Sequence, residues 1–108
     1  MPDVRLSTLS REYVRVQVSA TEAGSPVNPT ADTVQMAVTA AGVDPTTEWA
    51  TASWETEVTA TGTKYYARIQ VGPSSTVGQL AVGNYEIWVK VTDNPEVPVA
   101  QVGRLAIY

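Results

Sequence analysis

The chain has 108 residues, of which 44% are hydrophobic, and a formal net charge of −4. This length predicts a single domain that buries enough surface to fold alone. Cys and His are absent, which excludes disulfides, thiolate metal sites and the side chain best suited to proton transfer at neutral pH. The acidic excess argues against nucleic-acid partners, and no apolar run is long enough to suggest a membrane span.

The first part of the chain predicts two strands and a loop. Residues 1–9 are expected to form a short arm or a first edge strand, and they lack the basic and apolar regions of a signal peptide. Residues 12–19 and 32–39 alternate apolar and polar side chains, which is the period of a strand buried on one face. Residues 21–30 contain two prolines and a glycine, so we expect a loop there.

The middle of the chain is harder to assign. After a turn region at residues 40–47, Trp49 and Trp54 have opposite parity, so one regular strand cannot bury both indoles. A bulge between them, or two short strands around Trp54 and Glu55, would resolve the conflict. A turn then leads into a strand over residues 64–71, which again alternates apolar and polar side chains.

The last part predicts a flexible connection over residues 72–78, a brief strand over 79–82 and a long strand over 84–92. In that long strand Tyr85, Ile87, Val89 and Val91 point one way, and Glu86, Trp88, Lys90 and Thr92 point the other. A proline-flanked loop at 93–98 and a final strand over 101–107 follow.

These elements predict an all-β fold of about seven strands. The favoured arrangement is a single immunoglobulin-like antiparallel β-sandwich, and a small closed β-barrel is the alternative. Residues 1–9 would be the N-terminal arm or edge strand, and residues 10–108 the sandwich domain. At least one tryptophan should lie in the core, with Trp49 or Trp54 preferred.

The sequence offers little for catalysis or metal binding. Glu55 and Glu57 can share a strand face as paired carboxylates, but acidic residues are mostly exposed, so a solvated strand edge is the favoured interpretation. Asp93, Asn94 and Glu96 could offer oxygen ligands to Ca²⁺, but the flanking prolines favour a plain turn. We therefore predict no enzymatic activity, no catalytic residues, no cofactor and no metal.

One outer face is predicted to carry a ladder of aromatic and cationic side chains, provided that the strands bearing them are neighbours. Such side chains are enriched at interface hot spots. The alternative is that each ring merely covers a cross-strand neighbour, with a cation stacked on it. Together with the loop residues, the predicted partner interface consists of Tyr13, Arg15, Tyr66, Arg68, Trp88, Lys90, Asp93, Asn94 and Glu96.

The runs KYYARIQVGP at 64–73, LAVGNYEIWVKVTDNPEVPV at 80–99 and GRLAIY at 103–108 resemble small structural proteins encoded by tailed phages of actinobacteria. The resemblance covers about the C-terminal half, with weaker matches at 12–16 and 26–30. It implies a virion location, many copies or a homo-oligomer, and the major capsid protein or other virion proteins as partners.

The implied role is that of a capsid decoration or minor capsid protein, which docks on the capsid lattice. A head–tail connector or tail component is the alternative within the same class. From a different class, a carbohydrate-binding module could use Trp49, Trp54 or Trp88 as a stacking platform.

Overall fold

The computed structural model describes residues 3–22, 25–92 and 97–108, and these residues form strands and no helix. The strands are β1 (Asp3–Leu6), β2 (Glu12–Val18), β3 (Ala20–Glu22), β4 (Ser25–Val27), β5 (Thr33–Ala40), β6 (Ala50–Thr51), β7 (Ser53–Thr59), β8 (Gly62–Val71), β9 (Gly83–Thr92) and β10 (Val99–Ile107). The predicted all-β class is confirmed. Eight of these strands form the two sheets of the sandwich, of which β6 has only two residues, and β3 and β4 have three residues each.

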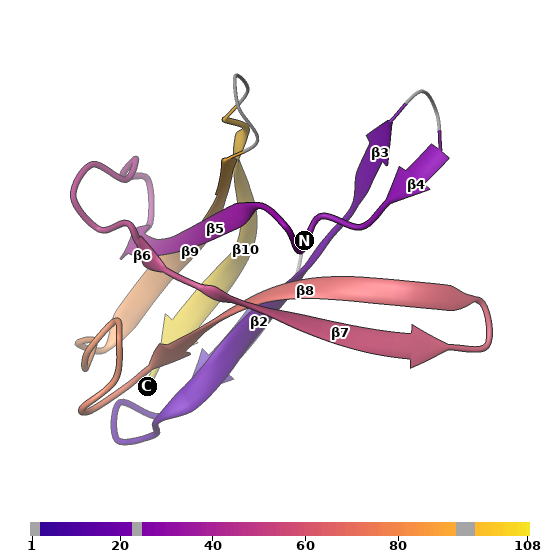
Figure 1. Cartoon of the computed structure of the whole chain (residues 1–108). Coiled ribbons are helices and arrows are strands. Elements are labelled where there is room, and N and C mark those ends of the chain that lie inside the picture. The colour runs from indigo at the N-terminus through magenta and orange to yellow at the C-terminus, as the bar shows by residue number, and fades with distance from the viewer. Residues whose placement is uncertain (1–2, 23–24, 93–96) are drawn as a thin grey trace.

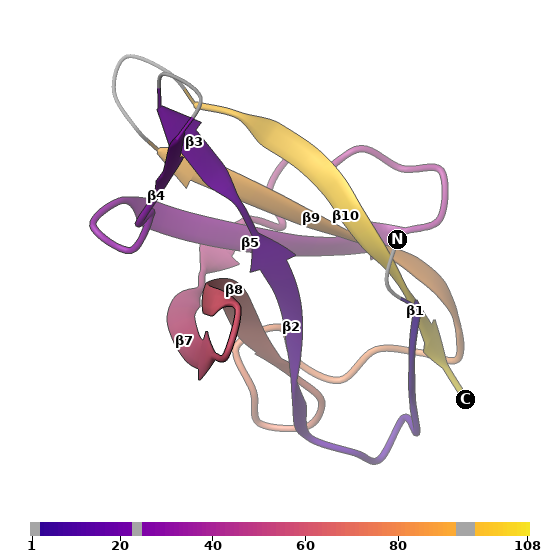
Figure 2. The ribbon, with the colours of Figure 1, turned by 90° about the vertical axis from the view of Figure 1, so that its right-hand side faces the viewer.

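Two sheets pack face to face, as Figures 1 and 2 show. One has the strand order β1-β10-β9-β5-β6 and the other the order β2-β8-β7, while β3 and β4 form a separate hairpin. In immunoglobulin-like terms, β2, β8 and β7 occupy the places of strands B, E and D, and β5, β9 and β10 those of C, F and G. This open sandwich excludes the closed barrel that the sequence left as an alternative.

One strand pair departs from the antiparallel prediction. β1 pairs in parallel with β10, so that Asp3 lies opposite Arg104 and Leu6 opposite Ile107. Residues 3–6 are therefore an edge strand of the five-stranded sheet, bonded to β10 of their own chain.

The core lies between the sheets, and the parity of each long strand predicts it. Met36 and Ile87 are completely buried, and Leu105 is nearly so. Each such side chain contributes on the order of 1.5–3 kcal/mol to the stability of the fold. The core cluster consists of Leu6, Val14, Val16, Val34, Met36, Val38, Ala67, Ile69, Val71, Ile87, Val89, Leu105 and Ile107.

The chain between residues 50 and 59 changes sheets, which explains the parity conflict around the tryptophans. β6 pairs with β5 in the five-stranded sheet, whereas β7 pairs with β8 in the three-stranded sheet. The break lies at Ala52, whose N–H donates to the Val34 carbonyl at 3.0 Å. A division into two strands is thus correct, but it lies at Ala52, and Trp54 and Glu55 both belong to the second strand.

Two other predicted segments differ from the structure. Residues 79–82 form no strand, because they bond to the β1–β2 connection: Thr8 Oγ1 donates to the Leu80 carbonyl, and Gln79 Nε2 donates to the Thr8 carbonyl, both at 2.9 Å. The expected loop at 21–30 includes strands of the β3–β4 hairpin, in which Ala20 lies opposite Val27. Three-residue strands are too short for a periodic pattern to reveal.

Candidate protein-interaction surface

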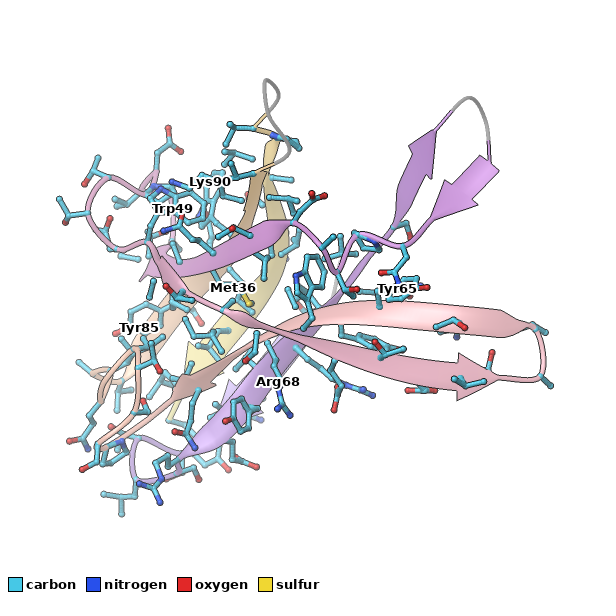
Figure 3. The ribbon with its side chains drawn as sticks, in the orientation of Figure 1. Met36, Trp49, Tyr65, Arg68, Tyr85 and Lys90 are labelled. Carbon is cyan, nitrogen blue, oxygen red and sulfur yellow. The ribbon has the colours of Figure 1, made fainter. Side chains whose placement is uncertain are left out.

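The outer face of the β2-β8-β7 sheet brings four of the predicted interface residues together. Tyr13 and Arg15 lie on β2, and Tyr66 and Arg68 lie on β8, all pointing away from the core because Val14, Val16, Ala67 and Ile69 alternate with them inward. Figure 3 shows Arg68 on the side of β8 that faces away from Met36. We call Tyr13, Arg15, Tyr66 and Arg68, together with Glu55 and Glu57 of β7, the ladder.

Within the ladder, each arginine covers a tyrosine on the neighbouring strand. The guanidinium of Arg15 lies 4.2 Å from the centre of the Tyr66 ring, and that of Arg68 lies 4.5 Å from the centre of the Tyr13 ring. Arg15 and Arg68 occupy directly opposite positions, an arrangement that by itself is unfavourable for like charges. Each guanidinium instead turns diagonally toward the tyrosine of the other strand, so the two cations point away from each other and lie on ring faces.

Glu55 and Glu57 neutralise the two arginines from the third strand. Arg15 Nη1 donates to Glu55 Oε2 at 2.8 Å and lies 3.6 Å from Glu57 Oε2, while Arg68 Nη1 lies 3.9 Å from Glu55 Oε1. The hydrogen bond to Glu55 is the main cause that raises the pKa of the Arg15 guanidinium. Arg15 therefore crosses β8 and joins all three strands, although such exposed pairs add little to stability.

Trp88 and Lys90 do not belong to this ladder, which corrects the prediction of one continuous face. Both point outward as expected, but β9 pairs with β5 and β10 in the other sheet. Alternation along a strand decides which face a side chain occupies, but not which sheet the strand joins. The predicted interface is therefore divided between the outer faces of two sheets.

A tryptophan layer covers the outer face of β5. Trp88 Nε1 donates to Thr39 Oγ1 at 3.1 Å, and that hydroxyl donates to the Val43 carbonyl at 2.6 Å. Lys90 Nζ lies 4.4 Å from the centre of the Trp49 ring, as can be followed in Figure 3. Together with the 41–49 loop, this layer leaves Thr39 only 3% exposed, although its side chain points away from the core.

Trp54 is the tryptophan that packs on the core. It lies opposite Ala67 on the inner face of β7 and contacts the core cluster, and its Nε1 donates to the Asp32 carbonyl at 2.9 Å. The expectation that Trp49 or Trp54 would be the core tryptophan is thus confirmed for Trp54. Asp93, Asn94 and Glu96, the remaining predicted interface residues, lie outside the described residues.

The sequence predicts the outward positions of the tyrosines and arginines, but not the contacts that fix their side chains. Glu55 and Glu57 share a face of the edge strand β7 and are partly exposed, as expected, but the sequence did not show that both carboxylates lie within 4.0 Å of Arg15. The outer cover of β5 also went unnoticed. The signal for this cover is Ala37, a small apolar residue at an outward position of β5, which is completely buried.

The described part of the chain includes two hollows on different sides of the five-stranded sheet. One of about 300 Å³ opens between the sheets near Val18, Val91 and Val102. Another, of about 400 Å³, lies on the outer face of β1, β10 and β9, where Arg5 and Arg104 alternate with Asp3 and Glu86. The described residues contain no group of three side chains that could hold a metal ion, and they form no helix that could cross a membrane.

Comparisons with known proteins leave the family open. No protein-family model matches the chain, and no curated protein or solved structure matches it.

Proposed function

We propose that the chain is a non-enzymatic structural protein of a bacteriophage particle, acting as a capsid decoration or minor capsid protein that docks on the capsid lattice. The observation that carries the proposal is the ladder, in which tyrosine, arginine and glutamate side chains contact one another on one outer sheet face. Tyr13, at its margin, is 54% exposed. Tyrosine and arginine are among the side chains that most often dominate binding energy at protein interfaces.

The internal contacts of the ladder suit it to docking. Because each guanidinium already lies on a ring and beside a carboxylate, little side-chain freedom remains to be lost when a partner covers the face. The resemblance of the C-terminal half to virion proteins of tailed phages supports the same role. A repeating lattice lets a modest contact be made many times, so each single contact can be weak.

The carbohydrate-binding alternative is less well supported by the placement of the indoles. Trp54 faces the core, Trp88 lies over β5 with its N–H bonded to Thr39, and Trp49 carries Lys90 on its ring. A stacking platform for a sugar requires a free aromatic face, which these contacts limit.

The test compares occupancy of purified particles by wild type, Tyr13→Ala and Tyr108→Ala. Tyr108 is the matched control, since it is 59% exposed and lies at the end of the other sheet. We expect Tyr13→Ala to lower the number of copies per particle and Tyr108→Ala to leave it unchanged. Full occupancy by Tyr13→Ala would refute the ladder as the docking face, and absence of the wild-type chain from particles would refute the virion role.

A further inference from the structure

The three-stranded sheet has two long edges to which no described strand is bonded. β2 and β7 stand at the two ends of the order β2-β8-β7, and each has seven residues. The edges of the other sheet are much shorter, with four residues in β1 and two in β6. Natural proteins usually shorten or interrupt an edge that must not pair with another chain, and neither β2 nor β7 contains a proline or glycine.

The β7 edge also projects from the sandwich. β2 accompanies β8 only from Tyr65 to Val71, so the first three residues of β8 pair with β7 alone. Figure 1 shows this β7–β8 hairpin extending to one side of the molecule. Val58 lies near its tip and is 81% exposed, an apolar side chain that another strand could cover.

The outer faces of the two edge strands carry opposite charges, although within one chain Arg15 already reaches across β8 to Glu55 and Glu57. On the outer face, β7 presents Glu55 and Glu57, and β2 presents Arg15. Pairing β7 with a second β7 would bring these carboxylates near one another, and pairing β2 with a second β2 would do the same for the arginines. Like charges across strands are unfavourable and opposite charges are favourable, so β7 of one copy suits β2 of another.

We propose that the β2-β8-β7 sheet continues from one copy of the chain to the next, with the β7 edge of one copy hydrogen-bonded to the β2 edge of its neighbour. Arg15 of the neighbour, which bonds across β8 to Glu55 of its own copy, then also lies beside Glu55 and Glu57 of the first copy, while the edge backbone supplies the main contact by strand addition. This inference rests on the proposed assembly role and names a second copy as the partner.

Such an interface uses two different surfaces of each copy. An open chain of copies has one unpaired β2 edge and one unpaired β7 edge at its ends. Copies can therefore keep adding to form a filament, unless the geometry closes them into a ring. Since the contributing ion pairs lie at the surface, association should weaken as salt shortens the range of their attraction.

A charge exchange between the edges tests the proposal on the full chain. Arg15→Glu makes both edges acidic, and the double variant Glu55→Arg with Glu57→Arg makes both basic. Sedimentation velocity at low salt should show wild type associating as its concentration rises. Each variant alone should associate at least tenfold more weakly, and an equimolar mixture of the two should recover association, because each acidic edge then meets a basic one.

Control variants reverse single charges elsewhere on the surface. Arg104→Glu and Asp44→Arg lie at exposed positions outside both edges and should associate as wild type does. Circular dichroism and urea unfolding verify that each variant is folded. If an exchange variant fails to fold, Val58→Lys takes its place, since it puts a charge on β7 at an exposed position and should also weaken association.

Two outcomes would overturn the proposal: a wild-type chain that stays monomeric at every concentration, or an Arg15→Glu variant that associates as well as wild type. Neither would overturn docking on a capsid, which requires a different protein and no pairing between copies. The occupancy of particles therefore tests the proposed function separately from the association of the free chain.

Discussion

Gly72, at the end of β8, is the position where a single methyl group should do the most damage. Its φ is +123°, and a Cβ there would lie 2.0 Å from the Ser10 carbonyl oxygen and 2.7 Å from Arg11 Cα. Both neighbours are backbone atoms of the β1–β2 connection, so no side-chain rotation can relieve the contact. Gly72→Ala must therefore displace that connection from the end of β8.

Gly78 provides a control in the same loop. Its φ is +86° and nothing lies within 4 Å of its Cβ position, so Gly78→Ala should cost only the backbone strain, about 1–2 kcal/mol. Gly72→Ala adds overpacking of about 1–3 kcal/mol to a similar strain. The expected difference between the two variants is about 2 kcal/mol, which corresponds to roughly 8 °C in Tm for a domain of this size.

Urea unfolding, followed by tryptophan fluorescence, measures both variants. Since the packing term acts only at Gly72, its variant should have the lower free energy of unfolding, with an m-value close to that of Gly78→Ala. Equal midpoints for the two variants would show that the β1–β2 connection does not pack against Gly72, and the reasoning would be refuted.

Three further predictions concern other parts of the fold. Trp88→Ala should lower the free energy of unfolding, measured in urea, by about 2 kcal/mol because it uncovers β5. This is less than the loss expected for truncating a fully buried tryptophan. An unchanged free energy of unfolding would mean that Trp88 does not cover β5. Met36→Ala should cost about 2–5 kcal/mol, whereas Val58→Ala should change stability by less than about 0.5 kcal/mol, and equal effects would contradict the assigned core. Backbone N–H groups, chiefly that of Thr46, lower the pKa of Glu48. The contribution of Glu48 to the free energy of unfolding is therefore complete above its unfolded pKa of about 4.3, and it is lost as pH falls from there through the lowered folded pKa. Glu48→Gln should make the free energy of unfolding depend less on pH in this acid range. An unchanged pH dependence would contradict the loop geometry.

Strand positions and inner faces could be read from the sequence because alternation is a local property. Val14, Met36, Ile69 and Ile87 follow from parity alone, and the core cluster contains all four. Which strands become neighbours depends on contacts between residues far apart in the chain. Parity alone therefore groups Trp88 with Tyr13, although their strands belong to different sheets.

The ladder shows the same limit at the level of side chains. The outward positions of Arg15 and Arg68 were predictable, but their opposition across β2 and β8 follows from the register, which no local pattern determines. The reach of Arg15 across β8 to Glu55 requires three strands in a known order. The sequence therefore predicts the exposed edge that carries Glu55 and Glu57, but not the arginine that they bond.

Counting copies of the chain in purified phage particles by quantitative mass spectrometry tests the central claim most directly. A decoration or minor capsid protein should be present in large, fixed proportion to the major capsid protein, whereas a neck or tail ring would give about a dozen copies or fewer. Particles that lack the chain altogether would contradict a virion role.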